Sequence, residues 1–150
     1  MINALLSNKV VIAALIAWLL GQGLKFPFEY LINKRWDWTI MFSTGGLPSS
    51  HSAVVTAVAL SIGLIDGFDT SLFALAAATG LIVIYDAAGV RRQAGFHAER
   101  INQIMRDFFE SGHFMENDLK EMLGHTPFEV FSGIILGVLV CLAVIYLLPL

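Results

Sequence analysis

Residues 127–148 read PFEVFSGIILGVLVCLAVIYLL, an apolar stretch in which Glu129 is the sole charged side chain. A helix needs roughly 20 apolar residues to cross the hydrocarbon core of a bilayer, so this stretch predicts a membrane-spanning helix. The rest of the chain is similar, because 57% of its 150 residues are hydrophobic and 14% are charged, against roughly 25% charged in a soluble domain. The sequence therefore predicts an all-α integral membrane protein that forms one domain over residues 1–150.

Three more apolar segments lie upstream and predict further spans. They are Val10–Leu24, Pro48–Ile65 and Ser71–Val90. The start of the first stays open, because Lys9 interrupts the apolar run. The middle segment is short and rich in Ser, Thr and Ala, so we expect it to pack inside the bundle rather than to face lipid. Four spans of this length make a thin bundle, which leaves room for a homodimer.

The connecting segments predict orientation and surface elements. Loops 25–47 and 91–126 carry Lys and Arg, whereas the connection between the second and third spans carries neither. By the positive-inside rule both long loops are cytoplasmic and both termini lie outside, and we expect the membrane to be a bacterial plasma membrane. The aromatic residues of 26–44 predict an interfacial segment. Residues 93–110 have apolar side chains at helical spacing, which predicts an amphipathic helix on the surface of the protein or the membrane, followed by a second short helix.

Three polar clusters interrupt this apolar chain at the ends of predicted spans. They are residues 48–51, 89–92 and 124–127, which contain two His, two Arg and several hydroxyls. The first opens a span, the second closes the next, and the third opens the one after. Because consecutive spans cross in alternate directions, the clusters should meet at one membrane–water boundary. A nucleophile, an acid and cationic groups at one place are what phosphate-ester chemistry requires.

The first cluster begins a helix. Ser49 and Ser50 suit an N-cap, which explains the serines but not His51 at the start of a span. The same geometry also makes an anion site, because free amide groups and the positive end of the helix dipole lie there. In the functional interpretation these serines bind phosphate and His51 protonates a leaving oxygen.

The second cluster, Arg91 and Arg92, has the ordinary interpretation of a topology anchor. Asp86 favours a functional interpretation over a simple anchor. An ionisable side chain about one turn inside the span costs free energy unless it has a charged partner. We therefore expect Asp86 to hold an arginine in position, and the planar guanidinium suits two phosphate oxygens. Lys25 is a further candidate for the phosphate cradle, although interfacial lysines usually extend to lipid headgroups.

The third cluster has a competing structural explanation. Thr126 to Glu129 fits a capping box with Pro127 as the first helical residue, and this leaves His125 unexplained. In the functional interpretation His125 is the nucleophile, and Glu129 accepts its Nδ1–H and leaves Nε2 free to attack. We expect these two roles of Glu129 to compete. His97 is the rival nucleophile.

Other ligand classes have little support in the sequence. The net charge of −3 gives no reason to expect nucleic acid. The four histidines lack a compact ligand spacing, so no metal and no cofactor are assigned. The expected partners are membrane lipids and a lipid phosphate substrate.

These motifs resemble the type 2 phosphatidic acid phosphatase and vanadium-dependent haloperoxidase superfamily. More closely, the chain resembles a small divergent branch marked by Gly-Gly-x-Pro-Ser-Ser-His-Ser and Tyr-Asp-Ala-x-Gly-Val-Arg-Arg, found here at residues 45–52 and 85–92. The resemblance implies that His125 is phosphorylated, that Glu129 orients it and that His51 is the acid. It also implies that Arg91 or Arg92 binds the phosphate.

The chain departs from the general pattern of the superfamily in two places. That pattern begins with Lys-x6-Arg-Pro, whereas Lys25 is followed at this spacing by Ile32. The pattern also has a short gap between arginine and histidine, which is matched literally by Arg91 and His97. Residue 101 is then Ile and not an acid. We prefer His125, because the acid, the proline and the small-residue helix follow it.

Three functions remain open from the sequence. The first is an enzyme, a lipid phosphate or diphosphate phosphatase at the cytoplasmic membrane face that forms a phosphohistidine intermediate. The alternative is a catalytically inactive membrane protein that binds or carries lipid phosphates, for which the missing first motif argues. The third is a small scaffold in which the polar clusters serve as caps and anchors.

Overall fold

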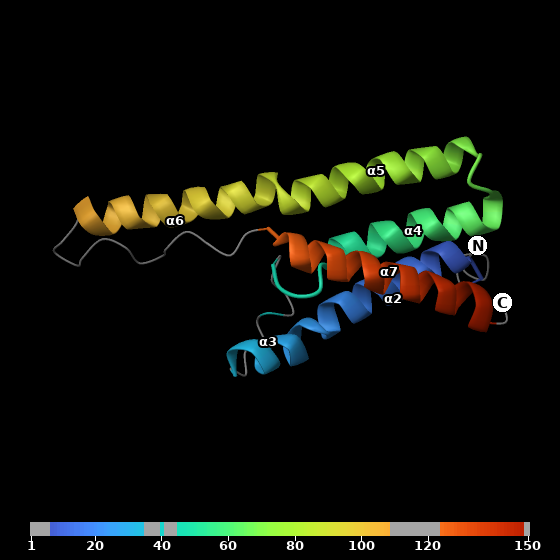
Figure 1. The fold of residues 1–150 in the computed structure, drawn as a ribbon, viewed down its shortest axis with the longest axis horizontal. Coiled ribbons are helices and arrows are strands. Elements are labelled where there is room, and N and C mark those ends of the chain that lie inside the picture. The colour runs from blue at the N-terminus through green and yellow to red at the C-terminus, as the bar shows by residue number, and fades with distance from the viewer. Residues whose placement is uncertain (1–6, 35–39, 41–44, 109–123, 149–150) are drawn as a thin grey trace.

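The computed structural model describes residues 7–34, 40, 45–108 and 124–148, and the regular structure within them is helical (Figure 1). The all-α membrane fold class predicted from the sequence is confirmed. The helices are α2 (Lys9–Gly23), α3 (Lys25–Asn33), α4 (Ser50–Asp66), α5 (Ser71–Ala88), α6 (Val90–Phe108) and α7 (Pro127–Leu147).

All four predicted spans are helical, but they differ in length. Within the described residues, three helical stretches are long and apolar enough to cross a membrane, namely Lys9–Asn33, Ser71–Met105 and Pro127–Leu147. The remaining helix, α4, is apolar but has 17 residues. It lies at the centre of the bundle and packs against α2, α5 and α7. The expectation of an inward position for the Ser- and Ala-rich segment is therefore confirmed.

Glycines bring the helices around α4 unusually close. A Cβ added to Gly133 of α7 would collide with the carbonyl oxygen of Ser49, and one added to Gly137 would collide with that of Ala53. On the other side, a Cβ on Gly21 of α2 would lie 2.9 Å from the Cα of Ser50. Small residues allow such backbone approach. The first turns of α4 are therefore clamped between α2 and α7.

The helices run alternately between the two ends of the bundle (Figure 1). The first and last described residues lie at one end, where Lys9 Nζ donates to the carbonyl oxygen of Ile145 at 3.2 Å. The starts of α4 and α7 lie at the opposite end, beside the end of α5. The alternation predicted from the sequence is therefore the arrangement of the structure.

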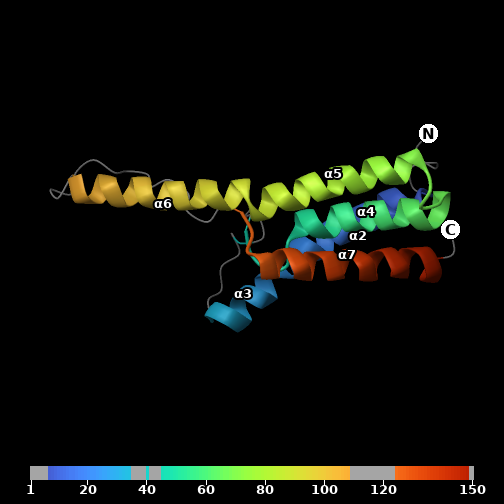
Figure 2. The same cartoon turned by 45° about the horizontal axis from the view of Figure 1, so that its top comes forward.

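Helix α6 differs from its prediction. It begins at Val90 directly after α5 and extends the line of α5 beyond the bundle, as both Figure 1 and Figure 2 show. The amphipathic helix predicted over 93–110 is therefore present, and what the sequence did not predict is that it continues the line of α5. The reason is that Gly89 has a φ of −106° and not the positive φ that usually ends a helix at glycine. Hydrophobic periodicity predicts a helix but not its direction relative to the one before.

The remaining surface predictions are tested in part. Of the aromatic residues in 26–44, Phe26, Phe28 and Tyr30 lie on α3. Trp36, Trp38 and Phe42 lie outside the described residues, as does the short helix expected before residue 124.

Candidate functional site

Two histidines from distant parts of the sequence face each other at the end of the bundle. His51 is in the first turn of α4, and His125 directly precedes α7. Their ring centroids are 5.9 Å apart, and the ring planes meet at 63°. The clamping of α4 by α2 and α7 brings the two rings together.

The backbone around His125 is anchored on the junction of α5 and α6. The His125 N–H donates to the carbonyl oxygen of Ala87 at 2.8 Å, and the His125 side chain is 1% exposed. Gly124 has a φ of +86°, and a Cβ there would collide with the main chain of Arg91 and Arg92. Glycine is therefore required at this position for two reasons, conformation and space. The sequence placed Gly124 in the third polar cluster, but this contact with Arg91 and Arg92 was missed.

Glu129 fixes the orientation of His125. Its Oε2 lies 2.9 Å from His125 Nδ1 and also accepts the N–H of Thr126 at 3.1 Å. The Thr126 hydroxyl in turn accepts the N–H of Glu129, which completes the capping box. The expected competition between the two roles was wrong, because one carboxylate oxygen has two lone pairs and can accept both bonds. The carboxylate thereby favours the tautomer with the proton on Nδ1.

The inner nitrogen atoms of the two histidines are buried and unpaired. His125 Nε2 and His51 Nδ1 have no hydrogen-bond partner within the described part of the chain. Buried polar atoms are normally paired, and exceptions mark sites of strain, catalysis or ligand binding. His125 Nε2 is therefore a buried ring nitrogen whose partner is missing among the described residues.

The start of α4 is built on Ser49. Its side-chain oxygen accepts from the N–H of Ser52 at 3.3 Å and from the Ser52 hydroxyl at 3.0 Å. The Ser49 N–H donates to the carbonyl oxygen of Glu129 at 3.0 Å. Ser49 and Ser50 are buried. The Ser49 side chain thus serves as the helix cap, and the amides of Ser50 and His51 lie in the first turn of α4, where N–H groups have no carbonyl partner within the helix. The contact of Ser52 with Ser49 was not predicted, although the pattern Ser-x-x-Ser at a helix start indicates such a bond.

The arginines behave differently from each other. Arg91 Nε donates to Asp86 Oδ2 at 2.9 Å, as the sequence predicted. Neither side chain is buried within the chain. Asp86 is 41% exposed and Arg91 is 44% exposed. The Arg92 guanidinium instead lies 5.3 Å from the ring centre of Phe96 along α6. Arg91 interacts electrostatically with His51, so it is the arginine nearer to the histidine pair.

Lys25 lies inside the protein rather than extending to headgroups. It begins α3, and its side chain is 1% exposed. It lies close enough to His51 and to Glu129 to interact electrostatically with both. The structure therefore places a buried lysine close to His51 and to the Glu129 carboxylate.

The rival histidine lies elsewhere. His97 is exposed on α6, and so is Ile101 one turn later. The literal Arg-x5-His spacing is therefore confined to a helix that leaves the bundle. His113 lies outside the described residues. Within the described ranges, no group of three or more His, Cys, Asp or Glu side chains could hold a metal ion.

The fold and this cluster define a membrane protein related to the type 2 phosphatidic acid phosphatases. Residues 6–140 match the family described as the Divergent PAP2 family, and the chain belongs to that family. The resemblance inferred from the sequence is thereby confirmed. The chain is also similar to YuiD of Bacillus subtilis (strain 168), which is named as an uncharacterized membrane protein. The two are 40% identical over 153 residues, which cover 95% of this chain and 97% of the relative. No solved structure matches the chain.

Proposed function

We propose that the protein is a lipid phosphate phosphatase that works through a phosphohistidine intermediate. The observation that carries this proposal is the state of His125. Its Nδ1 is bound to Glu129, and its Nε2 is buried, unpaired among the described residues and next to the ring of His51. A nucleophile oriented by a carboxylate, with a second histidine beside it, is the arrangement that nucleophilic catalysis requires.

In the first step, His125 Nε2 attacks the phosphorus atom of the phosphate monoester. The P–N bond forms while the P–O bond to the lipid alcohol breaks. The departing alkoxide takes a proton from protonated His51, and the alcohol is released. Glu129 stabilises the positive charge that develops on His125 through the bond at Nδ1.

In the second step, water attacks the phosphorus of the phosphohistidine. His51, now neutral, accepts a proton from this water as the P–N bond breaks. Orthophosphate is released, His125 returns to its neutral form and His51 is protonated again. The two steps balance without a metal or a redox partner.

Cationic groups and amides would hold the equatorial oxygens of the phosphoryl group. Arg91 is positioned by Asp86, and Lys25 is buried and close enough to His51 to interact with it electrostatically. The amides of Ser50 and His51 add the positive end of the α4 dipole. Fixed positive groups in a water-poor site stabilise the charge that spreads over these oxygens in the transition state.

The position of the site supports a lipid as substrate. His51 lies in the first turn of α4 and His125 directly before α7, and both helix starts lie at one end of the bundle (Figure 1). A headgroup at that level can reach His125 while its apolar part stays in the bilayer. The basic loops 25–47 and 91–126 favour the cytoplasmic face, and the bacterial plasma membrane is the proposed location.

The test is phosphate release by the purified protein from lipid phosphates and diphosphates in mixed micelles. Wild type, His125→Ala and His97→Ala run side by side, with folding checked by circular dichroism. We expect wild type and His97→Ala to release phosphate and His125→Ala to be inactive. Loss of release in His97→Ala alone would contradict the assignment.

The alternative is a protein that binds or carries lipid phosphates without hydrolysis. The departure that favours it is Ile32 in place of the arginine of the first superfamily motif. It predicts lipid phosphate binding that survives His125→Ala and no phosphate release in either form. The same panel, with a binding measurement added, distinguishes it from the phosphatase.

A further inference from the structure

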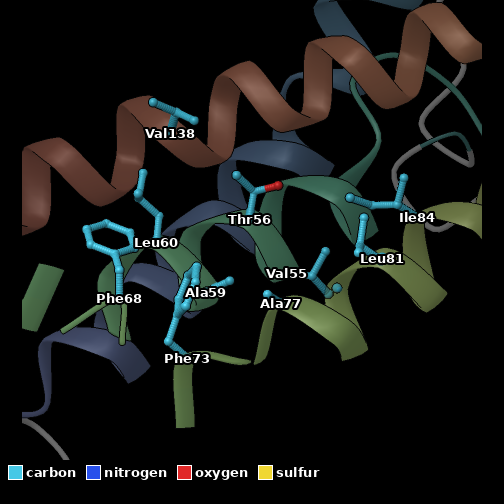
Figure 3. A pocket seen from close by; sticks show the side chains of 11 residues that line it. Val55, Thr56, Ala59, Leu60, Phe68, Phe73, Ala77, Leu81, Ile84 and Val138 are labelled. Carbon is cyan, nitrogen blue, oxygen red and sulfur yellow. The ribbon is translucent and has the colours of Figure 1, made fainter. Parts of the chain in front are cut away.

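An apolar groove lies between α4, α5 and α7 (Figure 3). Its volume is about 350 Å³, within the range of roughly 300–1,000 Å³ that is usual for ligand sites. Val55 and Ala59 of α4 face Ala77 and Leu81 of α5 across it, and Thr56 is the one polar side chain among the described residues that line it. The groove is open to the outside at the depth of the spanning helices, so it faces the lipid.

One end of the groove adjoins the histidine site. Val55 is one helical turn after His51 on α4. Ile84 is three residues before Ala87, whose carbonyl oxygen holds the backbone of His125. The groove therefore leads from the site toward the interior of the membrane.

Two aromatic rings stand at the other end. Phe68, in the connection between α4 and α5, and Phe73 of α5 both line the groove (Figure 3). Their ring centroids are 5.0 Å apart, and the planes meet at 78°. The Phe68 ring lies directly on Gly63, where a Cβ would displace it. The pair thus lines the end of the groove away from the site, with Phe68 still 54% exposed.

We propose that this groove holds one alkyl chain of the lipid phosphate and that the Phe68–Phe73 pair sets its preferred length. The inference rests on the proposed function, because the phosphate at His125 places the chain. From Ile84 to Phe73, α5 rises about 16 Å at 1.5 Å per residue. With C–C bonds of about 1.52 Å, an extended chain covers this distance with roughly a dozen methylene groups.

The groove acts on selectivity more than on affinity. A chain that leaves the bilayer for the groove exchanges one apolar environment for another, so little hydrophobic energy is gained. The gain comes from close fit, and a chain that reaches beyond Phe68 and Phe73 must bend or leave the groove. The substrate class is therefore a lipid phosphate with one chain in the groove, chosen by its length.

The test uses alkyl phosphates of increasing chain length that carry a photoactivatable diazirine near the tail end. Labelled peptides are mapped by mass spectrometry in wild type, Ala77→Leu and Ala78→Leu. Ala77 lines the groove, whereas its neighbour Ala78 is exposed, so the second variant is a matched control. Each protein is also tested for phosphate release from 4-nitrophenyl phosphate, which has no tail.

We expect labelling of residues 68–81 that peaks at one chain length and is competed by the unlabelled alkyl phosphate but not by the corresponding alcohol. Ala77→Leu should reduce this labelling roughly tenfold, because the new side chain takes the space of several methylenes. Ala78→Leu should leave it unchanged, and Phe73→Ala should move the peak to longer chains. Release from the tailless ester should be the same in all of them.

Two results would overturn the inference while leaving the proposed function in place. One is equal labelling in Ala77→Leu and Ala78→Leu beside phosphate release that depends on His125. The other is equal competition by the alcohol, which would make the groove a general lipid contact. The opposite result, specific labelling of the groove without phosphate release from any ester, would overturn the proposed function and support the groove.

Discussion

The carbonyl oxygen of Glu129 accepts the N–H of Ser49 at 3.0 Å, and this bond joins the start of α7 to the start of α4. The same Glu129 accepts the Nδ1–H of His125 through its carboxylate. Ser49 caps the helix that carries His51. One residue therefore orients one histidine and anchors the helix of the other, so the geometry of the pair depends on Glu129.

Glu129→Gln should impair catalysis more than stability. The amide oxygen of the new side chain can still accept a bond from the Thr126 N–H, but the amide lacks the charge that stabilises a cationic His125. We expect phosphate release to fall roughly 10²- to 10⁴-fold, the usual contribution of acid–base and orienting groups. Initial rates in mixed micelles measure this loss.

Thr126→Ala is the matched control for Glu129→Gln. It removes the hydroxyl of the capping box and leaves the carboxylate on His125. We expect a loss of about 1 kcal/mol in stability, the usual value for an N-cap, with phosphate release close to that of wild type. If both variants lose release equally, Glu129 acts through the cap and not through His125.

His51→Ala should separate the two chemical steps. With 4-nitrophenyl phosphate the leaving group needs no proton, so His125 is still phosphorylated, but water is no longer activated. We expect a burst of about one nitrophenolate per protein followed by slow turnover, measured by stopped-flow absorbance. Steady turnover at the wild-type rate would show that His51 is not the acid and base.

The two arginines should differ on substitution. Arg91 lies near His51 and is held by Asp86, whereas Arg92 lies over Phe96. We expect Arg91→Ala to lower kcat/KM roughly 10²-fold or more, as for the loss of one preorganised charge contact. Arg92→Ala should lower it much less. The reverse order would place Arg92 in the site.

The glycines of α7 should be sensitive to a single methyl group. A Cβ at Gly133 would collide with the main chain of Ser49, which cannot move like a side-chain tip. We expect Gly133→Ala to cost about 1–3 kcal/mol, as overpacking usually does, and to lower Tm in detergent. Gly23→Ala is the control, because a Cβ there meets no described atom within 4 Å, and its Tm should be unchanged or higher.

The sequence predicted the frame of this molecule from local patterns. Apolar runs located the spans, and the alternation of spans placed His51 and His125 at one end. The spacing of His125 and Glu129 by four residues predicted their contact, because such residues are neighbours at a helix start. The contact between Asp86 and Arg91 was predicted because an ionisable side chain inside a span needs a partner.

What the sequence did not predict depends on contacts between segments. The burial of Lys25 follows from how helices pack, which no local pattern contains. The contact of Arg92 with Phe96 is local, at a spacing of four residues on α6, but was not predicted. The double role of Glu129 was missed because its two bonds were treated as alternatives. The direction of α6 was missed because hydrophobic periodicity predicts a helix but not its direction, and the backbone at Gly89 lets α6 continue in line with α5.

The most direct measurement of the central claim is the position of a trapped phosphoryl group. The protein is incubated briefly with a ³²P-labelled lipid phosphate, quenched in alkali to preserve phosphohistidine, and digested for mass spectrometry. The account predicts an acid-labile phosphate on His125 in wild type and His97→Ala, and none in His125→Ala. Phosphate on His97, or hydrolysis that continues in His125→Ala, would contradict it.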